Sequence, residues 1–343
     1  MTEAARLLRW FAAARRDLPW RRTKDPWAIW VSEIMLQQTR VEAVREPFAR
    51  FLRRYPEPAA FAAATDDEVM VAWRGLGYYR RARLLRDGAR AVVARHAGRV
   101  PDRLDDLRAL PGVGPYTLGA IASIAFGHPE PAVDGNVERV IARHRGFTAP
   151  IGTSAARRTI RAVAADWLPR RRAGDFNQAL MELGATVCTP TSPRCGDCPI
   201  AADCVARTER RTAELPVRRR PRATVEVTAR VALVGRGDRL LGYRIPAGEP
   251  NEGQIELPGP GTLRDCDPDD LAAAVRRRFG AELTVGALVA TVRHAITHHR
   301  ITLHAHRATV RRKGCLAWFP RTPDTPWTTP SRKVFARSDA LEA

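Results

Sequence analysis

Apolar residues recur at three- and four-residue spacing along the first two-thirds of the chain, which is the period of amphipathic helices. This spacing predicts helices over residues 26–51, 66–73, 82–96 and 154–167, with Pro and Gly between them. Beyond residue 223 the pattern changes to the period of two that is typical of strands. Strands are expected over residues 224–234, 239–244, 291–294 and 300–310, with one helix at 268–279.

The segment from residue 207 to residue 223 separates these two patterns. It is polar and basic and contains Pro216 and Pro221, so we interpret it as a linker. A chain of 343 residues with 45% hydrophobic content is long enough for two cores. We therefore expect a mainly α domain over residues 1–206 and a smaller α+β domain over residues 224–343.

The charge of the chain changes the picture from a generic globular protein to a nucleic-acid binder. The formal net charge is +20 and the pI is near 11.1. An excess this large favours a polyanionic partner, because side chains that neutralise phosphates release condensed counterions. No apolar stretch is long enough to span a bilayer, and residues 1–10 do not resemble a signal peptide. We expect a cytoplasmic protein, nucleoid-associated in a bacterial cell, that acts as a monomer on double-stranded DNA.

Four of the six cysteines lie close together, in the run Cys-x6-Cys-x2-Cys-x5-Cys formed by Cys188, Cys195, Cys198 and Cys204. Four thiolates suit a tetrahedral zinc or a 4Fe-4S cluster, and this uneven spacing differs from the paired spacing of zinc ribbons. We interpret the run as the site of one 4Fe-4S cluster, with zinc as the alternative and disulfides less favoured. The loop after Cys188 would form a stiff basic protrusion ending in Arg194, which could touch a phosphate backbone.

The run Leu-Pro-Gly-Val-Gly-Pro-Tyr-Thr at residues 110–117 predicts a helix-hairpin-helix. A short helix is expected at 104–109, the glycines permit positive φ, and Pro115 suits the first turn of the next helix. The amides of Gly112, Val113 and Gly114 would then point outward and bind phosphate without reading sequence. A turn of this composition is often only a turn, but the flanking helices and the basic chain favour DNA binding.

Two carboxylates stand out by their context. Glu33 lies in a mostly apolar helix, where burial would raise its pKa toward the value that a general acid needs at neutral pH. Asp134 ends an apolar run and precedes Gly135, so it is placed to cap a helix. The alternatives are an exposed helix residue for Glu33 and a plain N-cap for Asp134. Beside the hairpin and the cysteines, the two are better interpreted as a catalytic pair.

Taken together, these motifs resemble the adenine DNA glycosylases of the MutY family, in the endonuclease III superfamily. The similarity rests on Leu-Pro-Trp-Arg at 18–21, the Glu33 helix with Gln-Gln-Thr at 37–39, Gly-Leu-Gly-Tyr-Tyr at 75–79, the hairpin, Val-Asp-Gly-Asn-Val at 133–137 and the four cysteines. The resemblance covers nearly all of the N-terminal domain. It implies a helix-hairpin-helix glycosylase domain, with a six-helix barrel over 26–133 and a cluster lobe over 1–25 and 134–206. It also implies base excision repair, by removal of adenine mispaired with 8-oxoguanine or guanine.

The resemblance assigns roles to individual residues. Glu33 would protonate the base and then activate water, Asp134 would stabilise the cationic sugar, and Tyr116 and Asn136 would orient them. Bifunctional relatives carry a lysine where this chain has Tyr116, so we expect a monofunctional glycosylase. The residues expected to fill or probe the opened duplex are Gln37, Gln38, Leu76 and Tyr78. Of the adjacent tyrosines Tyr78 and Tyr79, we expect one to pack in the core.

In this family the C-terminal domain resembles a Nudix, MutT-like fold that recognises 8-oxoguanine. The family reads the oxidised base with Phe-Ser-His in a hairpin, and the matching residues here are Ile296, Thr297 and His298. The helix at 271–278 lacks the clustered Glu residues that hold magnesium in a Nudix hydrolase, so we expect a binding module without pyrophosphatase activity.

Two other functions stay open. One is a mismatch-specific thymine or uracil glycosylase, which the presence of Glu33 argues against. The other is a non-catalytic DNA-damage binding protein, which the presence of both carboxylates argues against.

Overall fold

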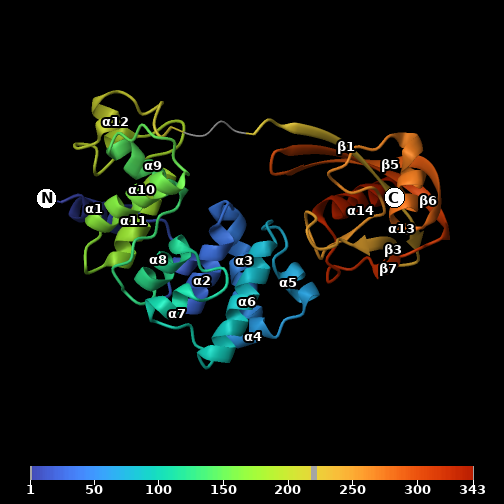
Figure 1. Cartoon of the computed structure of the whole chain (residues 1–343), viewed down its shortest axis with the longest axis horizontal. Coiled ribbons are helices and arrows are strands. Elements are labelled where there is room, and N and C mark those ends of the chain that lie inside the picture. Colours follow the sequence, from blue (N-terminus) through green and yellow to red (C-terminus); the bar gives the residue numbers. More distant parts are fainter. Residues whose placement is uncertain (1, 218–221, 343) are drawn as a thin grey trace. The chain divides into compact units, whose positions relative to one another are not determined.

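The computed structural model describes residues 2–217 and 222–342, and these form two compact units (Figure 1). The first unit comprises Met1–Ala64 and Arg80–Arg220, and the second comprises Thr65–Tyr79 and Pro221–Ala343. Residues 218–221 of the expected linker lie outside the described residues. The preceding part of that linker packs on the first unit, because Leu215 is buried and its carbonyl accepts a hydrogen bond from Arg143 Nε at 2.7 Å. The domain boundaries drawn from the sequence stay a prediction.

The first unit is built of helices, as the apolar spacing predicts (Figure 1). Its helices are α1 (Glu3–Ala14), α2 (Pro26–Leu36), α3 (Val41–Arg54), α4 (Pro58–Ala62), α6 (Arg80–Arg95), α7 (Leu104–Arg108), α8 (Pro115–Ile124), α9 (Gly135–His144), α10 (Ser154–Trp167), α11 (Ala173–Thr186) and α12 (Val205–Thr208), with short 3-10 turns η1 (Pro19–Arg21) and η2 (Cys195–Asp197). The segment 26–51, expected to be helical throughout, is divided into α2 and α3. The division falls at a turn in which Gln38 has a φ of +55°.

Two apolar cores in this unit position the site. One core joins α1, α9, α10 and α11 through residues such as Phe11, Val140 and Leu183. A smaller core joins α2 to α8 through Ile29 and Ala120, with Tyr116 packed against its edge. Because α2 and α8 pack together, Tyr116 and Thr117 at the start of α8 contact Glu33 and Gln37 near the end of α2.

The second unit is α+β, which confirms the expected fold class. It contains α5 (Asp66–Ala72), β1 (Val225–Leu233), β2 (Gly235–Arg236), β3 (Arg239–Arg244), β4 (Ile255–Glu256), η3 (Pro268–Asp270), α13 (Leu271–Phe279), β5 (Glu282–Ile296), β6 (His299–Arg312), β7 (Ala317–Pro320) and α14 (Thr329–Glu342). In one sheet β6 lies between β1, to which it is parallel, and β5, to which it is antiparallel. In the other, β3 pairs with β2, β4 and β7, all antiparallel. Among the described helices, none combines the length and apolar character needed to cross a membrane.

Candidate active site and iron-sulfur site

A cavity of about 1220 Å³ lies within the helical unit and brings together residues from distant parts of the sequence. The predicted site residues on its wall are Glu33, Gln37, Gln38, Gly112, Gly114, Tyr116, Asp134 and Asn136. No lysine lines the cavity among the residues that the structure describes. The structure therefore places the two predicted carboxylates and their two predicted orienting residues around one space.

Glu33 lies on α2, which begins after Asp25, whose carboxylate accepts hydrogen bonds from the amides of Trp27 and Ala28. The Glu33 side chain is buried, and its Oε2 accepts a hydrogen bond from the Tyr116 hydroxyl. Burial raises the pKa of Glu33 to about 7, the Tyr116 hydrogen bond opposes this rise, and the charge of Asp134 adds to it. A carboxyl group with this pKa is partly protonated at neutral pH, so it can donate a proton.

Asp134 caps α9 and also faces the cavity. Its Oδ1 accepts from the backbone amides of Asn136 at 3.0 Å and Val137 at 2.8 Å, and its Oδ2 accepts from Asn136 Nδ2 at 2.7 Å. Burial is the largest influence and raises the pKa of Asp134 above its usual value, although these three hydrogen bonds oppose the rise and favour the ionised form. Asp134 is therefore an N-cap of α9, and this does not exclude the catalytic role predicted for the same carboxylate.

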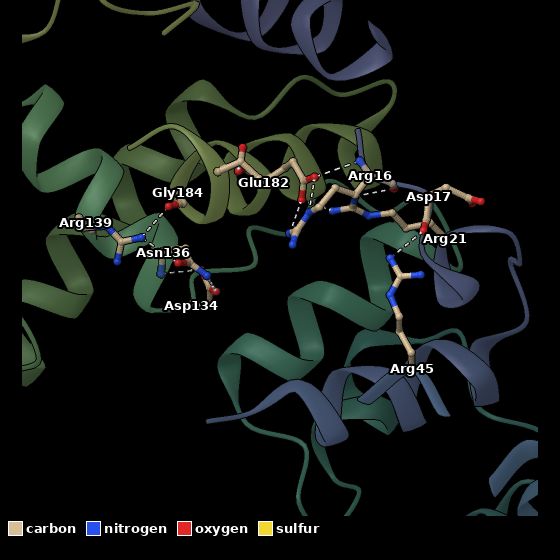
Figure 2. Close-up of polar contacts among 10 residues, drawn as sticks. Arg16, Asp17, Arg21, Arg45, Asp134, Asn136, Arg139, Glu182 and Gly184 are labelled. Atoms are coloured by element: carbon tan, nitrogen blue, oxygen red, sulfur yellow. Dashed lines mark hydrogen bonds and ion pairs between the residues drawn. The ribbon is translucent and has the colours of Figure 1, made fainter. Parts of the chain in front are cut away.

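Arg139, which sequence analysis did not single out, fixes the orientation of Asn136. Its Nη2 donates to Asn136 Oδ1 and to the Gly184 carbonyl, both at 2.8 Å, as Figure 2 shows. Its Nε donates to the carbonyl of Cys188 at 2.8 Å. A side chain at Gly184 would place its Cβ only 2.6 Å from the Cβ of Asn136, so a glycine is required for this approach of α11 to α9. Hydrogen bonds therefore run from Asp134 through Asn136 and Arg139 to the first cysteine of the run.

A second buried carboxylate, Glu182 on α11, lines the same cavity and was also missed. Arg16 donates to both of its oxygens at 2.8 Å and Arg21 donates to Oε2 at 2.8 Å (Figure 2). Burial alone would raise the pKa of Glu182, but the hydrogen bonds from the two arginines outweigh it and hold the pKa at about 2. Glu182 stands in the apolar stretch Ala-Leu-Met-Glu-Leu at residues 179–183 of α11, which is a local signal like the one that identified Glu33. Its partners could not be identified from sequence because they lie more than 160 positions away.

The hairpin before α8 differs in two respects from the expectation. Only Gly112 has a positive φ, of +78°, whereas Gly114 has a φ of −87°. The amide of Val113 donates to the carbonyl of Leu110 at 3.2 Å, and the side chain is largely buried, so this amide is not free to bind phosphate. Gly112 and Gly114 line the cavity and remain the phosphate-binding candidates.

The residues predicted to probe the duplex separate into two groups. Gln37 and Gln38 line the cavity, and Gln37 Nε2 donates to Thr117 Oγ1 at 3.3 Å. Leu76 and Tyr78 belong to the second unit. Leu76 is buried, whereas Tyr78 is 49% exposed, and the role of both in probing the opened duplex stays a prediction. Tyr79 is buried, so one of the two adjacent tyrosines packs inside, as expected.

Thr297 and His298 form the tip of the hairpin between β5 and β6. Thr297 has a φ of +53°, and its Oγ1 lies 3.3 Å from His298 Nδ1. The His298 ring lies against that of His299, with centroids 4.2 Å apart. The structure therefore places these two residues at the tip of a hairpin, with Thr297 exposed and His298 half-buried, and their role in reading the base stays a prediction.

The four cysteines of the run border one small cavity, and none of them is in a disulfide. Burial, together with the neighbouring thiols, raises the pKa of Cys198 to about 11. Its thiol therefore stays protonated at neutral pH until a bound metal displaces the proton. Four thiols around one small space can hold either a tetrahedral zinc or a 4Fe-4S cluster.

Arginines surround this cysteine cluster. Arg143 Nη1 lies 3.4 Å from Cys188 Sγ, and it donates to the Thr189 carbonyl at 2.6 Å. Arg194 is exposed, but it donates to the Thr186 carbonyl at 3.0 Å and pairs with Asp197 at 3.4 Å. The predicted basic protrusion is therefore held by contacts of its own, with Arg194 at its end.

Comparisons with known proteins agree with this geometry. Residues 31–165 match the family described as HhH-GPD superfamily base excision DNA repair protein, and residues 188–204 match the iron-sulfur binding domain of endonuclease III. The chain is 45% identical over 210 residues to human adenine DNA glycosylase, a match that covers 59% of this chain and 38% of that protein. It is 46% identical over 198 residues to the adenine DNA glycosylase of Mycolicibacterium smegmatis, covering 57% of this chain and 66% of that one.

Two solved structures share the fold of the helical unit. One is a thermostable thymine-DNA glycosylase, with a TM-score of 0.55 and 30% identity, covering 60% of this chain and 95% of that one. The other is endonuclease III in a non-covalent DNA complex, with a TM-score of 0.52 and 26% identity, covering 60% and 94%. The iron-sulfur interpretation of the cysteines is confirmed by the family match. The helical unit therefore belongs to the helix-hairpin-helix superfamily of base excision DNA repair proteins, and over this unit the chain is similar to adenine DNA glycosylases, of which it spans only part of the length.

Proposed function

We propose that this protein is a monofunctional DNA glycosylase that hydrolyses the N-glycosidic bond of adenine mispaired with 8-oxoguanine or guanine. The observation that carries the proposal is the state of Glu33, a buried carboxyl group with a pKa of about 7 on the wall of a large cavity. Adenine is a poor leaving group, so its departure requires a proton donor that works at neutral pH. The similarity to adenine DNA glycosylases supports the same substrate.

The two carboxylates are suited to different tasks. The adenine first leaves the base stack and enters the cavity, at a cost of a few kcal/mol that is smallest at a mismatch. Glu33 then donates its proton to a ring nitrogen of the base, while Tyr116 holds the carboxyl group in place through its hydroxyl. Asp134, whose two oxygens accept hydrogen bonds from amide groups that favour the carboxylate form, stabilises the oxocarbenium-like sugar. Glu33, now deprotonated, activates the incoming water.

A cavity wall without lysine, among the residues that the structure describes, favours a reaction that stops at the abasic site. A glycosylase that also cleaves the strand forms a Schiff base through a lysine. Tyr116 occupies the position of that lysine, and no lysine is found among the described residues of the cavity wall. The glycosidic bond is then broken by hydrolysis alone, without a Schiff base.

The other parts of the chain would bind and position the DNA. When bound to the four cysteines, a 4Fe-4S cluster supplies a rigid anchor for the segment that carries Arg194. Thr297 and His298 at the β5–β6 hairpin tip would read 8-oxoguanine on the opposite strand, in a Nudix-like domain without hydrolase activity. The net charge of +20 would supply the affinity for the phosphate backbone.

A panel of labelled mismatched duplexes tests this proposal. We expect release of adenine from A:8-oxoguanine and A:G, and no release of thymine or uracil from T:G and U:G. The second outcome matters because the thymine-DNA glycosylase structure shares 30% identity with this chain. Removal of a pyrimidine would favour that second function, and tight binding without any base release would favour a binding protein.

A further inference from the structure

Glu3, His144 and Asp203 bring one imidazole and two carboxylates together outside the catalytic cavity. Their ligand atoms all lie within 4.8 Å of one another. Glu3 is the first residue of α1, His144 is the last residue of α9, and Asp203 lies in the segment between the last two cysteines of the run. None of the three lines the cavity that contains Glu33.

His144 is a buried polar side chain without a visible partner. It is 3% exposed, and neither ring nitrogen has a hydrogen-bond partner among the described residues. Its ring packs edge-on against Trp167, with centroids 4.8 Å apart. A buried imidazole without hydrogen bonds is costly, and such groups in native proteins usually have a water or an ion as partner. The two carboxylates beside it favour a cation over water.

The donor set identifies the class of cation. One imidazole nitrogen with two carboxylate oxygens suits zinc and neighbouring divalent transition ions. The Asp203 side chain is 53% exposed, so water can complete the coordination. Arg6 forms an ion pair with Asp203 Oδ2, which leaves Oδ1 for a metal. The charges that act on His144 are the carboxylates of Glu3 and Asp203 and the guanidiniums of Arg6 and Arg145, so they balance, and metal binding would rest on coordination by the three ligand atoms.

We propose that Glu3, His144 and Asp203 form a second metal site, separate from the cysteine cluster, that binds a divalent transition ion such as Zn²⁺. This ion would tie α1 to the segment that carries the last cysteine. Asp203 precedes Cys204, whose Sγ lies 3.7 Å from the carbonyl of Arg143, the neighbour of His144. The site would therefore brace the cysteine cluster from outside.

Calorimetric titration of Zn²⁺ into the full chain carrying its cluster tests this proposal, after pretreatment with a chelator and with iron measured before and after. We expect one Zn²⁺ per chain with no loss of iron. Since loss of even an outer-shell partner of a metal site costs about 10–100-fold in affinity, Asp203→Asn and Glu3→Gln should each weaken binding by about 100-fold or more. Both change partly exposed residues, so they are less disruptive than a change at buried His144.

Asp197→Asn is the matched control, because Asp197 also precedes a cysteine of the run and pairs with an arginine. This variant should bind Zn²⁺ as the unaltered protein does. Zn²⁺ should also raise the thermal midpoint of the unaltered protein but not of Glu3→Gln. The proposal is overturned if the unaltered protein binds no Zn²⁺, if Asp203→Asn and Glu3→Gln bind it equally well, or if binding occurs only as iron is lost.

Discussion

Replacement of Glu33 by Gln should impair the reaction and stabilise the protein at the same time. Gln keeps the shape of the side chain and can still accept a hydrogen bond from Tyr116, but it has no proton to donate. Removal of a general acid typically slows the chemical step by about 100-fold or more. The same change removes a carboxyl group that is costly to ionise in this buried position.

The size of the stabilisation follows from the pKa of Glu33. Folding raises this pKa from 4.5 to about 7, and each pH unit corresponds to about 1.4 kcal/mol. The folded state therefore holds the Glu33 proton more tightly than the unfolded chain does. This contribution to stability is fully present below pH 4.5 and is lost as the pH rises through 7. Glu33→Gln does not titrate, so relative to the unaltered protein its free energy of unfolding should increase by about 2–3 kcal/mol between pH 5 and pH 8.

Two measurements check this prediction. Single-turnover release of adenine from an A:8-oxoguanine duplex reports the chemical step, and urea unfolding at pH 5 and pH 8 reports stability. Glu46→Gln is the matched control, since Glu46 is highly exposed on α3, and it should change stability by no more than about 0.5 kcal/mol. The reasoning is refuted if Glu33→Gln retains most of its activity, or if its stability relative to the unaltered protein is the same at both pH values.

Asp134→Asn should slow adenine release by about 100-fold or more, while circular dichroism shows that α9 persists, because Asn also caps helices. Borohydride added during turnover should trap no protein–DNA adduct, since Tyr116 offers no amine; a strong adduct would contradict the monofunctional mechanism. Thr297→Ala and His298→Ala should reduce cleavage of A:8-oxoguanine more than cleavage of A:G, and an equal loss on both would exclude base-specific reading. Cys198→Ser should yield protein that lacks the visible absorbance of the cluster and binds DNA more weakly, and unchanged affinity would argue against an anchoring role.

Local features of the sequence were sufficient to predict much of the helical unit. The helix α10 has the predicted bounds, because its apolar spacing is regular and it begins after the capping Thr153. The carboxylates Glu33 and Asp134 stand out because each is a polar residue in an apolar context, and such a context is visible in a short stretch of chain. The strand β3 was also predicted with its observed bounds, because the pattern that identifies it is contained in a short stretch of chain.

Features that depend on partners far apart in the chain could not be predicted. The pairing of Glu182 with Arg16 and Arg21 joins α11 to the start of the chain, and no local pattern encodes it. The strand β5 is longer than the predicted segment 291–294, because irregularities in its pairing with β6 break the alternation before residue 290. Leu76 was assigned by motif alone, which does not report burial.

Arg139 links the segment that carries the cysteines to Asp134, the carboxylate proposed to stabilise the sugar. One guanidinium holds both the main chain at Cys188 and the amide side chain that fixes Asp134. A displacement of that cysteine would be passed to Asp134 through two hydrogen bonds, without any change in the cavity wall itself. Oxidative loss of iron would then displace Asp134 while the helices stayed folded, so activity would be lost before the fold.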